Sequence, residues 1–409
     1  ESKYIEYTIS KNICTNNCEN YIKVTDSDTY AVIQNTLEII KNNKNGGKLK
    51  IKEGEYIVEK NIVLYSNVVL EGDGMNKTIL KLKNLASPWK TSRFSRAGFL
   101  RAVFKNENKC ENITILDLSL NGNKNNQNKD ENSKYGRFGI FTEACDNIYI
   151  KNIRIHDFQG YGFDPHGWKT SPSGALWANN LTILNSHADN NDWDGFTLDQ
   201  TDGIYIKDSI SINNGRHGFN IVTGSKNLIA ENLQSYNNGY YYYTGDGGCG
   251  IAIQNNRNYG TKNIKIFNSS FYNDKRNGLC SKDVINLQIN NNDFITMNEC
   301  ISLSNVNNSE FINNKCNSLS KNRFFNEKNT FNIIKNNNIL VNNAQEQSNI
   351  KDPLCNTGIK NKNICCLKSC GTCGGTGCGL RVGKSFGCCI STIINNNRRC
   401  SEYGPPCII

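Results

Sequence analysis

The chain has 409 residues, a net charge of +10 and 18 cysteines. It is long enough for one large domain with or without a small module, and it lacks the run of about 18 apolar residues that a transmembrane helix needs. A basic surface suits an acidic partner, but we find no recognised nucleic-acid-binding motif. We therefore expect neither a membrane span nor a nucleic-acid partner.

The cysteines are unevenly distributed, and ten of them lie between Cys355 and Cys407. An even, clustered count predicts disulfides formed in an oxidising compartment, so we expect a secreted protein of the cell wall or matrix. Zinc is the alternative for this Cys-rich end, but the stretch has no histidine and contains adjacent cysteine pairs. The sequence begins at Glu1 without an apolar leader, so we expect that any signal peptide was removed or was never included.

The N-terminal part predicts a cap for a larger domain. Cys14 and Cys18 form a local disulfide or an anchor to the body of the protein. A helix is expected from Tyr30 to Asn43, capped by Asp28 or Thr29 and ended by the glycines at 46–47. Its apolar face contains Ile33, Leu37 and Ile40. An amphipathic helix before the first coil of a solenoid would cover its open apolar end.

Short alternating strands follow, and from about residue 112 the chain repeats. Strands are expected at 48–51, 55–58, 62–65, 68–71 and 78–82. In the repeat, Asn or Gly followed by Ile or Leu begins each coil, and 23 residues separate Asn180 from Gly203. The members of this column are Asn147, Asn180, Gly203, Asn227, Asn263 and Asn286. A period in the twenties with short apolar strands predicts a parallel β-solenoid.

A second column consists of Gly-Phe pairs at 162–163, 195–196 and 218–219. After each glycine every second residue is apolar, which places one side of a strand inward and the other outward. The residues expected outward are Asp164, His166, Thr197, Asp199, Asn220 and Val222. Because adjacent parallel strands lie about 4.8 Å apart, residues such as Asp164, Thr197 and Asn220 become stacked neighbours.

Two long excursions leave the coils. The first, 121–137, is an expected exposed loop that contains Lys129, Lys134 and Arg137; these cations are either solvated or form a basic wall of a groove for an acidic chain. The second, 240–248, begins with four consecutive tyrosines. Their rings either stack on sugars or pack against the solenoid.

Seven side chains with acid–base or charge-binding chemistry are expected to converge on three adjacent coils. They are Tyr161, Asp164, His166, Asp194, Asp199, Arg216 and His217. These groups suit proton abstraction α to the carboxylate of a uronic acid: Arg216 neutralises the carboxylate, and His166 and Tyr161 act as base and acid on opposite faces of the ring. Return of the proton gives the C5 epimer, cleavage of the 4-O bond gives β-elimination, and a pair of aspartates leaves hydrolysis open.

The motifs Y-G-F-D-P-H at 161–166, D-G-F-x-x-D at 194–199 and R-H-G-F-N-I-V at 216–222 resemble those of the catalytic module of mannuronan C5-epimerases. The resemblance extends from the Tyr30 helix to about residue 340. It implies a right-handed parallel β-helix that converts β-D-mannuronate to α-L-guluronate within alginate. Incubation with polymannuronate would separate this activity from a lyase, a hydrolase or a non-catalytic adhesin.

The resemblance also implies roles for individual residues. The acid/base pair falls on Tyr161 and His166, the essential aspartate on Asp164 and the arginine on Arg216. With the outward positions and the basic loop, the predicted substrate-binding residues are Asp194, Asp199, His217, Asn220, Lys129, Lys134 and Arg137. Lys129 comes from a loosely aligned lysine of the family.

The C-terminal part departs from the bacterial members. It lacks their glycine-aspartate calcium-binding repeats and resembles the Cys-rich tails of brown-algal-type relatives, which either bind polysaccharide or form a stable appendage. We therefore expect no required cofactor, with Ca²⁺ as the one candidate, and a monomer that acts on an acidic polysaccharide. The expected organisation is an N-terminal segment 1–28, a β-helix 29–343, a linker 344–354 and a Cys-rich module 355–409.

Overall fold

The computed structural model describes residues 4–15, 18–86, 98–103, 109–127, 137–168, 176–239, 247–255, 259–319 and 323–341, and the backbone of 391–394 and 397–400. The chain divides into two compact units, 1–341 and 342–409. In the second unit, β31 (Ser391–Ile394) and β32 (Asn397–Cys400) pair antiparallel. The rest of the expected linker and Cys-rich module lies outside the described residues.

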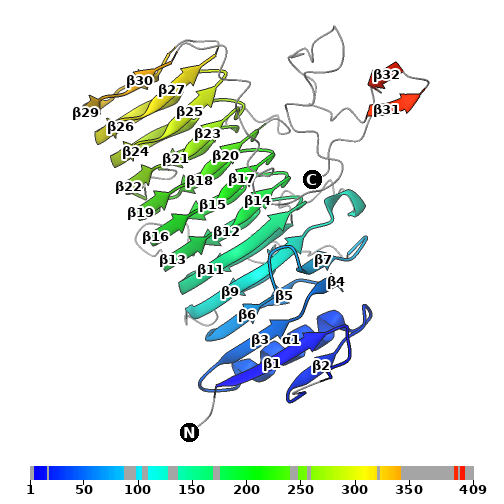
Figure 1. Cartoon of the computed structure of the whole chain (residues 1–409). Helices are drawn as coiled ribbons and strands as arrows, with labels where there is room; N and C mark the ends of the chain where they lie inside the picture. Colours follow the sequence, from blue (N-terminus) through cyan, green and yellow to red (C-terminus); the bar gives the residue numbers. More distant parts are fainter. Residues whose placement is uncertain are drawn as a thin grey trace. The chain divides into compact units, whose positions relative to one another are not determined.

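The first unit is a parallel β-helix whose coils pass through three strand faces in turn (Figure 1). The first face stacks β3 (Gly47–Ile51), β6 (Val68–Glu71), β9 (Cys110–Asn121), β11 (Cys145–His156), β13 (Ala178–Leu184), β16 (Thr201–Lys207), β19 (Lys226–Glu231), β22 (Lys262–Phe267), β24 (Leu279–Asn290), β26 (Ile301–Ile312) and β29 (Phe331–Asn336). The predicted fold class is confirmed.

Four long strands of the first face continue into a second one: β9 and β11 into the second face, and β24 and β26 into the third. The second face adds β4 (Gly54–Val58), β7 (Thr78–Leu82), β14 (His187–Asp189), β17 (Ile210–Ile212), β20 (Gln234–Tyr236), β23 (Ser270–Tyr272), β25 (Asp293–Thr296), β27 (Lys315–Ser318) and β30 (Ile339–Leu340). The third adds β5 (Ile62–Val63), β8 (Gly98–Val103), β10 (Phe138–Glu143), β12 (Phe163–His166), β15 (Phe196–Asp199), β18 (Phe219–Val222), β21 (Ile251–Gln254) and β28 (Phe325–Lys328).

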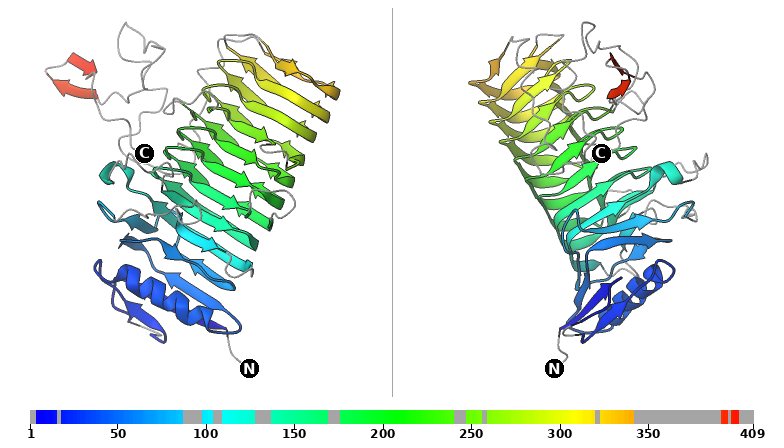
Figure 2. Two further views of the ribbon diagram at one scale, coloured as in Figure 1. Left: turned by 180° about the vertical axis from the view of Figure 1, so that it is seen from behind. Right: turned by 45° about the vertical axis from the view of Figure 1, so that its right-hand side comes forward.

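An N-terminal helix covers the first coil, as expected. The helix α1 (Thr29–Lys41) buries Ile33, Leu37 and Ile40 in the central core, across the end of the stack (Figure 2). Its predicted cap is not formed, because the Asp28 carboxylate instead accepts hydrogen bonds from the backbone and hydroxyl of Thr25. Beside it, β1 (Ile5–Ser10) pairs with both β2 (Tyr21–Lys23) and β3. Among the described residues no helix has the length and hydropathy needed to span a bilayer.

The Asn column has a physical cause at the start of each first-face strand. Asn147, Asn180, Asn227 and Asn263 have φ between 54° and 59°, a left-handed conformation that asparagine tolerates better than most residues. Their side-chain amides also bond from coil to coil: Nδ2 of Asn180 donates to Oδ1 of Asn147 (3.1 Å), and Nδ2 of Asn263 to Oδ1 of Asn227 (2.9 Å). The column therefore fixes the backbone bend and the register together.

The Gly-Phe column has a different cause. The rings of Phe163, Phe196 and Phe219 stack inside the helix, with centroids 4.5 and 4.8 Å apart. A Cβ on Gly195 would lie 2.2 Å from Oγ of Ser211 in the next coil. Glycine is therefore required by the close approach of the coils.

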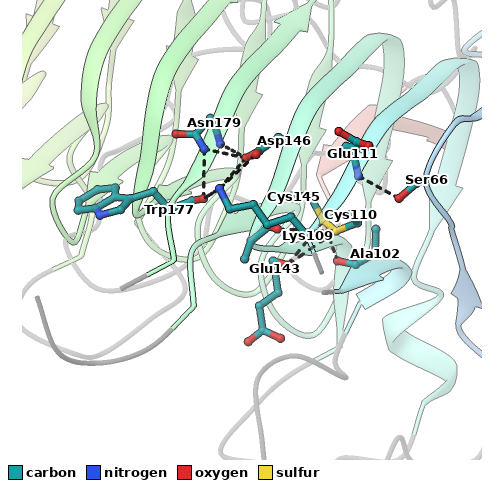
Figure 3. Close-up of a disulfide and its surroundings, with 11 residues drawn as sticks. Ser66, Ala102, Lys109, Cys110, Glu111, Glu143, Cys145, Asp146, Trp177 and Asn179 are labelled. Atoms are coloured by element: carbon teal, nitrogen blue, oxygen red, sulfur yellow. Dashed lines mark hydrogen bonds and ion pairs between the residues drawn. A yellow bond between two sulfur atoms is a disulfide. The ribbon is translucent and has the colours of Figure 1, made fainter. Parts of the chain in front are cut away.

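Disulfides connect neighbouring coils. Cys110 and Cys145 are register partners on β9 and β11 and are bonded to each other (Figure 3). Cys249–Cys280 and Cys300–Cys316 also join different coils, whereas Cys14–Cys18 is local. Near the first bridge, Lys109 binds the Asp146 carboxylate and the carbonyl oxygen of Trp177 (Figure 3). These links reinforce the stack, and Cys110, Cys145, Cys300 and Cys316 are themselves buried in the apolar core.

Candidate active site

Three consecutive strands of the third face, β12, β15 and β18, carry the predicted cluster. Phe196 pairs with Phe219 and Thr197 with Asn220, as the spacing predicted. Between β12 and β15 only Phe163 and Phe196 pair. Pro165 lies on β12 and has no N–H to donate to a neighbouring strand. The strand that carries Asp164 and His166 is therefore paired less completely with β15.

The residues before the glycines form the predicted column. The N–H of Gly162 donates to the backbone carbonyl oxygen of Asp194 (3.0 Å), and the N–H of Gly195 donates to that of His217 (3.0 Å). Tyr161 occupies the same position one coil earlier, where its backbone carbonyl oxygen accepts a hydrogen bond from the N–H of Gly139 (2.9 Å). Tyr161, Asp194 and His217 are therefore neighbours along the helix axis.

Tyr161 is held in an aromatic wall and faces Arg216. Nη1 of Arg216 donates to its hydroxyl oxygen at 3.1 Å. The ring lies 4.9 Å from that of Phe138 and 4.8 Å from that of Trp193. Burial and the Asp194 carboxylate raise the pKa of the phenol, while Arg216 acts in the opposite direction. The phenol is therefore protonated at neutral pH, with a cation placed to stabilise the phenolate once the proton leaves.

Asp194 and Asn220 hold this arrangement together. The fully buried carboxylate of Asp194 accepts hydrogen bonds from the His217 N–H (2.9 Å), Oγ1 of Thr197 (3.1 Å) and Nδ2 of Asn220 (2.9 Å). Nε of Arg216 lies 3.6 Å from it. Asn220 is 4% exposed, and its oxygen accepts from Gln254. Both were predicted to bind substrate. Their polar side-chain atoms have partners within the protein, and the substrate-binding role stays a prediction.

Asp164, His166 and Asp199 form the second half of the cluster. Nδ1 of His166 lies 3.0 Å from Oδ2 of Asp199, but the two atoms are not aligned for a hydrogen bond. Oδ1 of Asp164 and Oδ1 of Asp199 have no hydrogen-bond partner among the described residues. Burial, with Asp199 adding to it, raises the pKa of Asp164 to about 8. Burial opposes charge on His166, but Asp199 and Asp164 together raise the pKa of His166 to about 9. The group therefore holds protons at neutral pH.

The expectation that this polar face is exposed is wrong for most of its members. Asp164 is 2% exposed and Thr197 is 3% exposed, whereas the His166 side chain is 28% exposed. The strand parity is as predicted, but tight stacking of adjacent coils removes the shorter side chains from water. His166 is therefore the most accessible member of the group formed by Asp164, His166 and Asp199.

The same group has the ligand atoms for a metal ion. One atom from each of Asp164, His166 and Asp199 lies within 4.8 Å of the others. An imidazole with two carboxylates suits a transition metal such as zinc or manganese. Calcium prefers about six to eight oxygen ligands, so this cluster does not fit the calcium considered from the sequence.

The basic-loop residues are only partly placed. Arg137 is 8% exposed and donates to Gln127 (2.8 Å), Gln159 (3.2 Å) and the carbonyl oxygen of Ala86 (2.9 Å). The expectation that Arg137 is exposed, either solvated or on a groove wall, is wrong, because these acceptors hold the guanidinium inside the protein. Lys129, Lys134 and the four tyrosines at 240–243 lie outside the described residues.

Several residues near the site were not predicted from the sequence. Phe138 and Trp193 enclose Tyr161, and the ring of Phe141 stacks on that of His166 at 6.0 Å. Glu143 is the register partner of His166 on β10. Extending the Gly-Phe column one coil back, to Gly139, would have identified this strand.

Comparisons with known proteins agree with the fold and the motifs. Residues 95–235 match the family described as right handed beta helix region. Mannuronan C5-epimerase AlgE3 of Azotobacter vinelandii is 29% identical over 236 residues, 56% of this chain and 11% of that protein. Alginate lyase 7 of the same organism is 31% identical over 192 residues, 45% of this chain and 20% of that protein. This chain thus spans a fifth or less of the length of these two relatives.

A solved structure gives the same architecture. The A-module of mannuronan C-5 epimerase AlgE6 from Azotobacter vinelandii superimposes with a TM-score of 0.60 at 23% identity, covering 75% of each chain. The AlgE4 A-module also gives 0.60, at 19% identity, and covers 75% of this chain and 91% of that one. The resemblance seen in the motifs is confirmed by these sequence relatives, and the two solved structures show the same fold.

Proposed function

We propose that this chain converts β-D-mannuronate to α-L-guluronate within polymeric alginate, as the names of its epimerase relatives suggest. One observation carries the proposal. Tyr161 and His166 lie at opposite ends of one short segment, and Arg216 from a later coil reaches the Tyr161 hydroxyl. A phenol, an imidazole and a guanidinium can therefore surround a single sugar ring.

The reaction begins with the carboxylate of the uronate. Arg216 neutralises it, and protonated Asp164, whose pKa is raised to about 8, donates a hydrogen bond. His166, once neutral, removes the C5 proton through Nε2, because Nδ1 faces Asp199. The electron pair of the broken C5–H bond moves into the carboxyl group as an enediolate.

Tyr161 completes the inversion. Its hydroxyl gives a proton to the opposite face of C5, and the electron pair returns from the enediolate to form the new C5–H bond. Arg216, 3.1 Å from the phenol oxygen, stabilises the resulting phenolate. His166 then releases its proton to solvent, and the Tyr161 phenolate takes up a proton from solvent, which restores the starting state. No bond of the polymer backbone is broken.

β-Elimination is the second candidate, because one relative is named an alginate lyase. Its first step is the same, but the enediolate would expel the 4-O substituent. Hydrolysis is less favoured. Retaining and inverting glycosidases place their two carboxyl groups about 5 Å or more apart. Here one carboxylate oxygen of Asp164 and one of Asp199 lie within 4.8 Å of each other.

We also propose that the protein works outside the cytosol, on an acidic polysaccharide. Four disulfides among the described cysteines support an oxidising compartment. A net charge of +10 favours association with a polyanion.

Incubation with polymannuronate in heavy water, followed by proton NMR, tests the reaction. Guluronate signals with deuterium at C5 support the epimerase. Unsaturated ends that absorb ultraviolet light would instead indicate the lyase, and new reducing ends without them a hydrolase. Unchanged polymer would contradict all three, and a parallel incubation with a chelator tests the need for a metal.

A further inference from the structure

The column that contains Tyr161, Asp194 and His217 continues into the next coil. The N–H of Gly218 donates to the backbone carbonyl oxygen of Cys249 at 3.1 Å, just as the N–H of Gly195 donates to the backbone carbonyl oxygen of His217. Cys249 is fully buried and forms a disulfide with Cys280 on β24. A covalent bond therefore fixes the backbone of the coil that follows His217.

Side chains of this column accept hydrogen bonds from the backbone of the next coil. Oδ1 of Asp194 accepts the His217 N–H, and Nδ1 of His217 accepts the Cys249 N–H at 3.2 Å. A ring nitrogen that accepts a hydrogen bond carries no proton, so the neutral ring of His217 has its proton on Nε2. Burial lowers the pKa of His217 to about 4, which keeps the ring neutral at pH 7.

The Nε2 atom of His217 is buried and has no hydrogen-bond partner among the described residues. A buried donor without an acceptor is unfavourable. Its position next to Arg216 therefore points to an acceptor atom on a ligand. The same anchored segment also lies along Arg216: a Cβ on Gly247 would be 3.4 Å from Cα and 3.5 Å from Cβ of Arg216.

We propose that the Cys249–Cys280 disulfide is a positioning element of the active site. It holds the Cys249 N–H against Nδ1 of His217 and so keeps Nε2–H as a donor for the substrate carboxylate. The identity of this acceptor rests on the proposed function, whereas the tautomer does not. Cys249 acts through His217 and touches no reacting atom.

The test compares two double variants. Cys249→Ala/Cys280→Ala removes the anchor, and Cys300→Ala/Cys316→Ala removes a disulfide for which no His217 contact is seen, so it serves as the matched control. Nitrogen-15 NMR of the imidazoles reports the tautomer, with the His217 signals assigned by their loss in His217→Asn. We expect the Nε2–H pattern in the wild type and the control, and a mixture of tautomers in the first variant.

Steady-state kinetics provide the second readout. The first variant should lose about tenfold in kcat/KM relative to the control, the effect of weakening one hydrogen bond to a charged group. An unchanged tautomer with equal kcat/KM in the two variants would overturn the proposal. A tautomer change in a protein that does not act on polymannuronate would refute the proposed reaction and still support the positioning role.

If the double variant does not fold, two substitutions of His217 supply the test. Asparagine keeps an acceptor for the Cys249 N–H but has no donor at the Nε2 position, whereas glutamine can place an amide N–H there. The proposal expects His217→Gln to retain more kcat/KM than His217→Asn. The reverse order would overturn it.

Discussion

Two groups of buried polar side chains lie on the same coils and differ in how their hydrogen bonds are satisfied. In an inner ladder, the N–H and Nδ2 of Asn191 both donate to Oδ1 of Asn214 (3.0 and 2.9 Å), and Asn214 repeats this with Asn238. Asn238 ends on the carboxylate of Asp274. No side-chain nitrogen or oxygen of these four buried residues lacks a partner.

The active-site group on the third face is incomplete by comparison. Asp164 and Asp199 each retain an oxygen without a partner, and His217 retains a nitrogen. Unpaired buried polar atoms are costly. Burial of polar residues therefore does not by itself distinguish the two groups. The candidate site differs because it gathers unpaired atoms of two aspartates and a histidine on adjacent coils.

The largest effect should come from the acid/base pair. Tyr161→Phe and His166→Gln are each expected to lower turnover by a factor on the order of 10³, because proton transfer by a placed group contributes about 10²–10⁴. Phenylalanine keeps the packing against Phe138 and Trp193, so thermal unfolding should change little. Retained activity in either variant would remove that residue from the pair.

The next effect concerns the pH profile. Burial raises the pKa of Asp164 to about 8, with the Asp199 carboxylate adding to it. Burial lowers the pKa of His166, but Asp199 and Asp164 outweigh it and raise this pKa to about 9. Asp199→Asn removes this charge, so both values fall and the pH optimum for epimerisation should move to lower pH by about one unit or more. The position of the optimum is read from kcat/KM between pH 5 and 10, whatever the absolute rate. An unmoved optimum would contradict the coupling of these three groups.

The inner ladder predicts an effect on stability alone. Burial raises the pKa of Asp274 from 3.8 to about 7. Between these values the folded state holds more protons than the unfolded state, so this group costs stability as pH rises from 3.8 to 7. Asp274→Asn keeps the ladder acceptor, and the free energy of unfolding at pH 8 should rise by on the order of 2–4 kcal/mol.

Urea unfolding of both proteins at pH 4 and pH 8 measures this difference, which should nearly vanish at pH 4. An equal difference at both pH values would contradict the assignment of the effect to ionisation. Epimerase activity should not change, because Asp274 lies in the satisfied group.

The smallest effect concerns the outer Asn column. Asn263 has φ of 58° and donates to Asn227. Asn263→Ala places a Cβ in the left-handed region and should cost about 1–2 kcal/mol, whereas Asn263→Gly should cost less, since glycine adopts this conformation freely. Chemical denaturation at pH 7 measures both. Equal costs would show that the side-chain hydrogen bond to Asn227, and not the backbone conformation, is the reason for asparagine at this position.

The coils, and the residues that the coils bring together as a candidate site, could be predicted from the sequence. Asparagine at left-handed positions and glycine where coils approach closely are local steric requirements. A large apolar residue, phenylalanine in three coils, recurs with them at spacings that can be counted. Tyr161, Asp194 and His217 could be aligned as a column because each precedes such a glycine.

Only the tertiary structure decided what each of these side chains does. Asp194 became a framework carboxylate and Arg137 a buried donor because neighbouring coils brought them acceptors and donors. The pairing of His166 with Asp199, and of His217 with Cys249, joins residues about 30 positions apart. Desolvation and hydrogen-bond satisfaction depend on these neighbours in space, and no local pattern in the chain encodes them.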